Sequence, residues 1–197
     1  QLSDYATREA GISLNVVHDD ILSVDFEQAL KPASGRSPVK VVANLPYNIA
    51  TAVIIRLLER PELFTDITAL VQKEVADRIA APPRDSARGS LSVFCQSRAE
   101  CEPGFLIPPG AFNPPPKVMS RVVKLNPFTA DPFGIINRKI FDRLVEAAFE
   151  HRRKTCYNSL RISLEKGAGA TLLPPEMEAA ELLDNLFEAV GIGRPPR

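Results

Sequence analysis

The sequence is poor in the residues from which metal sites and many nucleophilic active sites are built. Its 197 residues include only two histidines, His18 and His151, which lie far apart in the chain. The three cysteines, Cys95, Cys101 and Cys156, are odd in number and lack the spacing of metal ligands. We therefore expect no metal centre, no histidine-activated nucleophile, and free thiols in a reducing compartment.

Long apolar runs are also absent. No stretch approaches the roughly 18 apolar residues of a membrane-spanning helix, and the first residues do not resemble a signal peptide. Hydrophobic residues make up 45% of the chain and charged residues 24%, which is typical of a globular protein. We expect no transmembrane segment, and a length that allows one core with a second, small domain.

Acidic and basic side chains balance in number but not in distribution. Residues 1–30 carry six acids and one base, residues 117–166 carry eleven bases and five acids, and residues 174–190 carry five acids and no base. Four residues that are or can become cationic follow one another at 151–154. This asymmetry indicates a surface that faces a polyanion. A set of solvated helix faces is the plainer alternative.

Strand patterns alternate with helical patterns up to residue 126, and only helical patterns follow. Strands are expected at 13–17, 40–43, 67–71, 102–107 and 118–125, and helices at 49–60, 73–81, 91–98, 136–152, 158–164 and 176–190. The alternation predicts an α/β layer with a largely parallel sheet, and the last two strands predict an antiparallel edge. We expect an α/β domain at 1–126 and a helical domain at 127–197.

One tetrapeptide suggests a chemistry. Asn44, Leu45, Pro46 and Tyr47 follow a valine-rich strand and precede a helical pattern. An exocyclic amine of a nucleobase is a poor nucleophile, and the Asn44 side chain and the Leu45 carbonyl could accept its N–H hydrogens. Pro46 stiffens the turn, and the Tyr47 ring offers a stacking face worth about 1–3 kcal/mol per base. An ordinary turn with a core tyrosine is the alternative.

Five stretches together resemble the KsgA family of ribosomal RNA adenine dimethyltransferases. They are VVANLPYNIAT at 41–51, LVQKEVADRIAA at 70–81, GSLSVFCQ at 89–96, PPGAFNPPPKV at 108–118 and HRRKTCYNSL at 151–160. The resemblance implies a Rossmann-like methyltransferase sheet and transfer of methyl groups from S-adenosylmethionine, without a metal, to N6 of two adjacent adenosines. It further implies small-subunit rRNA in the immature ribosomal subunit as partner, a cytoplasmic monomer and a role in ribosome biogenesis.

The same resemblance implies site residues. It assigns catalysis to Asn44, Leu45, Pro46 and Tyr47, cofactor contacts to Asp20, Ile21 and Asn44, and substrate or RNA contacts to Tyr47, Phe112, Arg152, Arg153 and Lys154. Asp20 would accept from the adenine amine of the cofactor, and Tyr47 and Phe112 would clamp a flipped base from both sides. The plainer interpretations are a surface turn for Asp20 and a core side chain for Phe112.

Some features depart from the family pattern. Its glycine-rich cofactor loop lies upstream of the part matched here, so we expect the sequence to be incomplete at its N-terminus, and also at its C-terminus. Arg88, Met119 and Arg121 stand where other residue types are common. Two alternatives stay open: a non-catalytic RNA-binding protein of ribosome assembly, and a large-subunit rRNA adenine methylase of the antibiotic-resistance type.

Overall fold

The computed structural model describes residues 14, 16–30, 38–167, 170–172 and 174–193. Contacts divide the chain into two compact units. The first, here called the sheet unit, comprises residues 1–76 and 99–129, and the second, the helical unit, comprises residues 77–98 and 130–197. Each unit has its own set of buried side chains, so the two are described separately.

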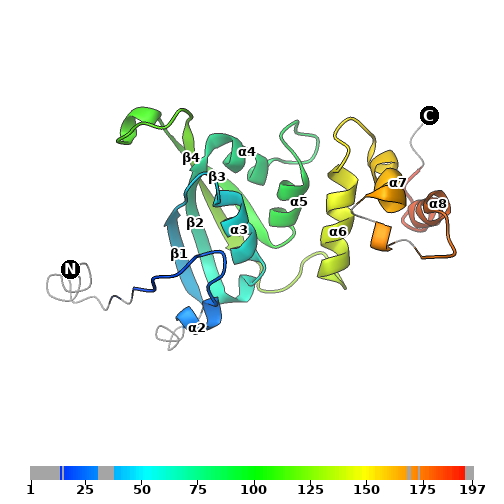
Figure 1. The fold of residues 1–197 in the computed structure, drawn as a ribbon, viewed down its shortest axis with the longest axis horizontal. Helices are drawn as coiled ribbons and strands as arrows, with labels where there is room; N and C mark the ends of the chain where they lie inside the picture. Colours follow the sequence, from blue (N-terminus) through cyan, green and yellow to red (C-terminus); the bar gives the residue numbers. More distant parts are fainter. Residues whose placement is uncertain (1–13, 15, 31–37, 168–169, 173, 194–197) are drawn as a thin grey trace. The chain divides into compact units, whose positions relative to one another are not determined.

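Four strands form the sheet of the first unit (Figure 1). They are β1 (Val39–Asn44), β2 (Phe64–Gln72), β3 (Ala99–Ile107) and β4 (Ser120–Pro127), in the order β1-β2-β4-β3. The β1 and β2 strands are parallel, while β4 is antiparallel to both β2 and β3. The sequence predicted a largely parallel sheet. Among the described strands only one adjacent pair is parallel. The β2 and β3 strands also run in the same direction and are connected through helices, but β4 lies between them and is antiparallel to both. The β1 and β2 strands are neighbours joined by a helical crossover.

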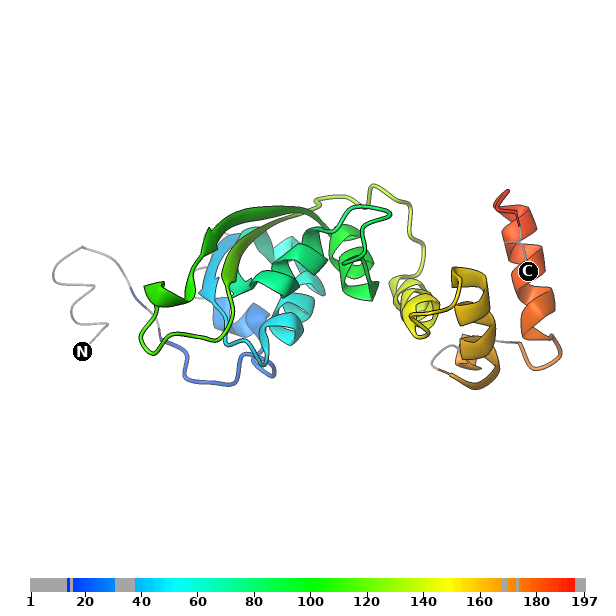
Figure 2. The same cartoon turned by 90° about the horizontal axis from the view of Figure 1, so that it is seen from above.

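That crossover contains helix α3 (Ala50–Leu58), which lies against one face of the sheet (Figures 1 and 2). Its buried residues recur every three or four positions: Ala50, Val53, Ile54, Leu57 and Leu58. On β2 the buried positions alternate with half-buried ones from Ile67 to Val71. The opposite face is open at β1, where the Val42 side chain is 84% exposed.

The predicted strand at 13–17 is not formed by its described members. Leu14, Val16 and Val17 lie outside any strand and are exposed, while residues 13 and 15 lie outside the described part of the chain. The reason is that a strand needs a paired neighbour as well as an alternating pattern. An acidic turn follows, in which the Asp20 carboxylate accepts a hydrogen bond from the Leu22 amide at 2.9 Å.

Helix α2 (Phe26–Leu30) continues from this turn and is attached to the sheet unit by side chains. Arg56 of α3 donates to the Val24 carbonyl at 2.6 Å, and its guanidinium lies 5.3 Å from the centroid of the Phe26 ring. Phe26 in turn meets Phe64 of β2 edge to face, with centroids 5.8 Å apart. The acidic turn is thereby held next to the first residue of β2.

The helical unit is built mainly from α5 (Ser90–Gln96), α6 (Arg138–Phe149), α7 (Cys156–Lys166) and α8 (Ala179–Ala189). Helix α4 (Lys73–Ala80) begins in the sheet unit and ends in the helical one. Short 3-10 turns occur at Pro61–Leu63, Pro109–Ala111 and Ala170–Leu172. The buried cluster of α6, α7 and α8 comprises Ala147, Tyr157, Leu160, Leu164, Ala179 and Leu183.

Both α6 and α7 begin at capping side chains. Asn137 accepts from the Ile140 amide and Thr155 from the Asn158 amide, which satisfies amides that the helix itself leaves unbonded. At the other end of α7, Gly167 packs closely against the helix. A Cβ there would lie 2.8 Å from the Ser163 Cα and 2.6 Å from a carboxylate oxygen of Glu150.

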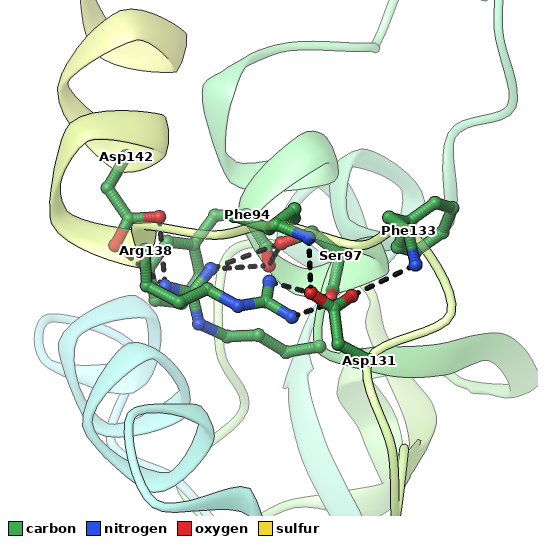
Figure 3. Close-up of polar contacts among 8 residues, drawn as sticks. Phe94, Ser97, Asp131, Phe133, Arg138 and Asp142 are labelled. Atoms are coloured by element: carbon green, nitrogen blue, oxygen red, sulfur yellow. Dashed lines mark hydrogen bonds and ion pairs between the residues drawn. The ribbon is translucent and has the colours of Figure 1, made fainter.

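A buried ion pair joins α5 to α6 (Figure 3). Arg98 follows α5 directly, its side chain is only 7% exposed, and one guanidinium nitrogen donates to both carboxylate oxygens of Asp142 at 2.8 and 2.6 Å. The guanidinium also stacks on the Phe94 ring, 3.7 Å from its centroid, and donates to the Ser97 hydroxyl. The arginine is therefore paired, stacked and hydrogen-bonded, as a buried charge requires.

A second ion pair fixes the segment that leads into α6 (Figure 3). Arg138 donates to the Ser97 carbonyl at 2.9 Å and pairs with Asp131 at 3.0 Å. The Asp131 carboxylate also accepts from the Phe133 and Ile135 amides. These amides, first that of Phe133, together with Arg138, hold the pKa of Asp131 below its ordinary value.

The loop between α4 and α5 is also tightly braced. Arg88 and Gln96 both donate to the carbonyl oxygen of Ala81, and Arg88 also donates to the Gln96 side-chain oxygen. At the exposed tip of this loop Arg84 adopts a φ of 73°, a left-handed conformation that is uncommon for a residue with a Cβ.

Candidate active site

Three chain segments meet at one edge of the sheet. The strands β1 and β2 are parallel and end there, at Asn44 and Gln72. The loop from β3 to β4 emerges at the same edge, since Ser120 is paired with Gln72 on one side and with Ile107 on the other. Ligands of open α/β sheets bind outside the carboxyl ends of the strands. This edge is therefore the candidate active site.

The register also places three polar side chains on one face of the sheet. Asn44 pairs with Leu70, and Ser120 pairs with Gln72, two positions further along β2. Residues two apart in a strand point to the same side. Asn44, Leu70, Gln72 and Ser120 therefore share the face on which Val42 is exposed.

The turn after β1 holds its backbone while leaving acceptors available. Leu45 is buried, and its amide donates to the Leu70 carbonyl at 3.2 Å. The Pro46 carbonyl accepts from the Ile49 amide at 3.1 Å, which leads into α3. The Asn44 side chain is exposed at the strand end. An amide oxygen and a main-chain carbonyl next to each other form a suitable pair of acceptors for the two hydrogens of an exocyclic amine.

The Tyr47 side chain is fixed at its far end. Its hydroxyl lies 2.6 Å from the hydroxyl of Ser120, the first residue of β4, and the ring is half-buried. The sequence predicts a stacking ring at Tyr47 but gives no indication of this serine. No local pattern could have identified it, because 73 positions separate the two residues.

Phe112 lies in the loop between β3 and β4, at the edge where Tyr47 is found. A 3-10 turn, Pro109–Ala111, precedes it, and the Phe112 amide donates to the Pro109 carbonyl at 3.1 Å. The Phe112 side chain is half-buried. The loop is tied back at its end by a bond from the Lys73 amide to the Met119 carbonyl at 2.9 Å. The two-sided clamp of Tyr47 and Phe112 stays a prediction.

The structure gives roles to the two arginines that depart from the family pattern. Arg121 donates to the Gly104 carbonyl at 3.0 Å and so braces the β3–β4 hairpin. Arg88 braces the α4–α5 loop through the Ala81 carbonyl. Both side chains are thus engaged in local structure.

The expected cofactor residues Asp20 and Ile21 lie in the exposed turn before α2. One carboxylate oxygen of Asp20 is engaged with the Leu22 amide, and its main-chain carbonyl accepts from Ser23 and Val24. The Ile21 side chain is 38% exposed. The second oxygen of the Asp20 carboxylate can accept a hydrogen bond from an adenine amine. The neighbouring Ile21 side chain can pack against the base. The assignment itself stays a prediction.

The basic residues Arg152, Arg153 and Lys154 are exposed in the turn between α6 and α7, within the helical unit. The sequence pattern predicts that the preceding helix continues to Arg152, but α6 ends at Phe149. The helix stops there because the chain turns, with the Lys154 amide donating to the His151 carbonyl, before Thr155 caps α7. The three cations therefore lie outside both helices, between the carboxyl end of α6 and the amino end of α7.

Other kinds of site find no support in the part of the chain that the structure describes. No group of three or more histidine, cysteine or acidic side chains is placed to hold a metal ion there. All three cysteines are free thiols, and burial, with the nearby Glu100, raises the pKa of Cys101 to about 12. No described helix combines the length and the apolar character needed to cross a membrane.

Comparison with known proteins agrees with the motif resemblance. A family model described as "Ribosomal RNA adenine dimethylase" matches residues 4–181. Among curated proteins, the ribosomal RNA small subunit methyltransferase A of Xylella fastidiosa is 42% identical over 147 residues, which cover 75% of this chain and 55% of that protein. The protein of the same name from Xanthomonas euvesicatoria is 40% identical over 171 residues, 86% of this chain and 64% of that protein. The matched part of the chain thus spans 55% to 64% of the length of these relatives.

Solved structures with the same fold support the architecture. A dimethyladenosine transferase from Plasmodium falciparum superposes with a TM-score of 0.74 at 24% identity, covering 96% of this chain and 68% of that one. The 23S rRNA methyltransferase ErmE superposes with a TM-score of 0.57 at 20% identity, covering 98% and 69%. At these identities the likeness shows the fold alone, which is Rossmann-like.

Proposed function

Because the chain belongs to the ribosomal RNA adenine dimethylase family, we propose that it dimethylates N6 of two adjacent adenosines near the 3′ end of small-subunit rRNA. The observation that carries this proposal is the turn at the end of β1. It presents the acceptors of Asn44 and Leu45 next to a tyrosine ring whose hydroxyl is held by the sheet. Curated relatives named as small-subunit enzymes favour this substrate over large-subunit rRNA and over a non-catalytic role.

Two acceptors at the strand end suit the chemistry of an aromatic amine. When the Asn44 oxygen and the Leu45 carbonyl accept the N6 hydrogens, the nitrogen lone pair is turned out of conjugation with the ring. The cofactor, S-adenosylmethionine, supplies a methyl carbon that its sulfonium group already activates. The residues then need to align the amine and exclude water, so no histidine or paired carboxylate is required. After the first transfer only one N–H remains, and the slot must accept a methyl group in its place.

Asp20 and Ile21 are the residues of this chain that we assign to the adenine end of the cofactor, and Asn44 to its methyl end. The fit rests on chemistry: a carboxylate in an exposed turn, an apolar side chain next to it, and an amide at the strand end. The turn is held in place through Val24 and Phe26. We further propose that residues 1–126 act as the catalytic domain and residues 127–197 as a helical domain, in a cytoplasmic monomer.

RNA contact is assigned to Arg152, Arg153 and Lys154. They are exposed, lie together, and precede the amino end of α7, where partial positive charge attracts phosphate. Immature small ribosomal subunits are the proposed partner. Binding there would depend mostly on backbone charge and on the shape of the RNA.

The catalytic assignment is tested in the full-length protein with unmethylated small subunits as substrate. Asn44→Ala should abolish most methyl transfer while leaving RNA affinity close to that of the wild type, because its oxygen acts at the reacting nitrogen. Asn48→Ala, an exposed asparagine of the same turn, is the matched control and should stay active. Near-normal turnover of Asn44→Ala would contradict the assignment. Methylation of free large-subunit rRNA instead, or cofactor binding without transfer, would favour one of the two alternatives.

The RNA contact is tested by salt dependence. Replacing Arg152, Arg153 and Lys154 with alanine should weaken binding to small subunits and lower the slope of log K against log salt by about 0.7–0.9 per lost phosphate contact. Lys166→Ala, an exposed cation at the far end of α7, serves as the control. An unchanged slope together with a lower melting temperature would instead indicate that the three residues stabilise the α6–α7 turn.

A further inference from the structure

The Tyr47 side chain crosses the end of a strand. It starts in the turn after β1 and reaches Ser120 on β4, and β2 lies between these two strands in the sheet. Neighbouring strands lie about 4.8 Å apart, so β1 and β4 are separated by roughly 10 Å. The ring therefore spans the carboxyl end of β2, where Asn44 and Gln72 end their strands.

Ser120 offers a rigid anchor for the far end of this ring. It is fully buried, and its backbone is held between two strands by its pairing with Gln72 and Ile107. The residue before it is tied to the start of α4 by the bond from the Lys73 amide to the Met119 carbonyl. The position of the serine oxygen is thus set by the sheet and not by the loop.

A hydroxyl held in this way limits what the ring can do. A tyrosine side chain turns about two bonds, and its terminal torsion is broad. A hydrogen bond of 2.6 Å, at the short end of the O–H···O range, fixes the hydroxyl oxygen at the far end of the ring. It therefore restrains rotation about the Cα–Cβ bond and sets the direction of the long axis of the ring. Stacking on a base requires that the ring be held at one position. A phenylalanine could supply the same face but not the same restraint.

We propose that Ser120 is a positioning residue, which acts through the Tyr47 hydroxyl to hold the stacking ring at the position that the target base requires. The inference rests on the proposed function and deepens it. It also means that a shift of the loop that carries Phe112 would move the Tyr47 ring, because Ser120 is the residue at which that loop enters β4.

The test uses Tyr47→Phe, Ser120→Ala and the double variant in the full-length protein, with Ser92→Ala as control. Ser92 is likewise fully buried, but it belongs to the helical unit and donates to the Arg78 carbonyl. Each single variant should lower kcat for small-subunit methylation about 3- to 10-fold, with little change in KM. The double variant should be no slower than either single one. The control should lose stability and keep its kcat.

Stability separates positioning from a merely structural role. Removing both hydroxyls leaves no unsatisfied partner, so the double variant should recover melting temperature relative to Ser120→Ala. Its kcat should stay low, since the ring remains unrestrained. Recovery of kcat together with stability, or single variants with unchanged kcat, would overturn the proposal.

A measurement without substrate keeps this result distinct from failure of the proposed function. The chain has three tyrosines, so the Tyr47 ring signals in an aromatic NMR spectrum are identified by their loss in Tyr47→Phe. Ser120→Ala should shift these signals and average the Hα–Hβ couplings of Tyr47, because the side chain is then no longer held in one χ1 rotamer. If the wild type methylates no rRNA but the ring is freed as expected, the function is wrong and the restraint is right. An unchanged ring signal would refute the restraint itself.

Discussion

Asp142→Ala is expected to be among the more destabilising single substitutions in the helical unit. It would leave the guanidinium of Arg98, whose side chain is 7% exposed, without its carboxylate partner. Removing one member of a buried pair costs about 3–5 kcal/mol. The Asp142 side chain is 29% exposed, so water can replace part of what is lost, and we expect a decrease of about 2–4 kcal/mol in the free energy of unfolding.

Urea unfolding followed by circular dichroism measures this change, and hydrogen exchange of the α5 and α6 amides locates it. Glu165→Ala is the control, because Glu165 pairs with Arg161 at 3.6 Å on the exposed side of α7, where about 0.3–0.5 kcal/mol is expected. Raising the salt concentration should weaken the exposed pair more than the buried one.

A double substitution tests whether the cost arises from the unpaired charge. Arg98→Met combined with Asp142→Leu removes both charges and keeps apolar volume beside Phe94, so it should be more stable than Asp142→Ala alone. If Asp142→Ala costs no more than the Glu165 control, the buried pair does not hold α5 to α6, and the reasoning fails.

Three further outcomes can be measured with single variants. Gly167→Ala should lower the free energy of unfolding by about 1–3 kcal/mol in urea, because its Cβ would meet backbone, whereas Gly89→Ala has nothing within 4 Å and should be nearly neutral. Arg84→Gly should raise stability by up to about 1 kcal/mol, since glycine adopts a φ of 73° without strain; a loss in thermal melting would contradict this. The lowered pKa of Asp131 means that its contribution is present above the ordinary value of 3.8 and is lost as the pH falls through the lower folded-state pKa. The free energy of unfolding of Asp131→Asn should therefore change less with pH in that range. A pH dependence equal to that of the wild type would count against the role of this carboxylate.

Local signals predicted much of the chain correctly. The strand before Asn44, the helix after it and the hairpin before residue 126 were all predicted, because their periodicity and bounding turns are local in sequence. The helical ends were less accurate. Helix α6 stops at Phe149, because the chain turns there to reach the Thr155 cap of α7, and a sequence pattern alone does not indicate where that turn falls.

Features that depend on distant partners were not predictable from sequence. The alternating residues near Val16 looked like a strand, but no described neighbour pairs with them. The antiparallel direction of β4 against β2 depends on how the chain returns to the sheet. The Arg98–Asp142 pair joins residues 44 positions apart, and many other acids could have served as partner.

The candidate site is therefore encoded largely by the core that sets the register of β4. Val123 and Leu125 are fully buried opposite Ala69 and Ile67, so a slip of one residue would turn both towards the open face. The same slip would carry Ser120 to the other side of the sheet and away from the Tyr47 hydroxyl. Apolar residues that never touch a substrate thus decide where the stacking ring is held. For this reason, substitutions that shift β4 should impair the site even when the residues of the turn after β1 are intact.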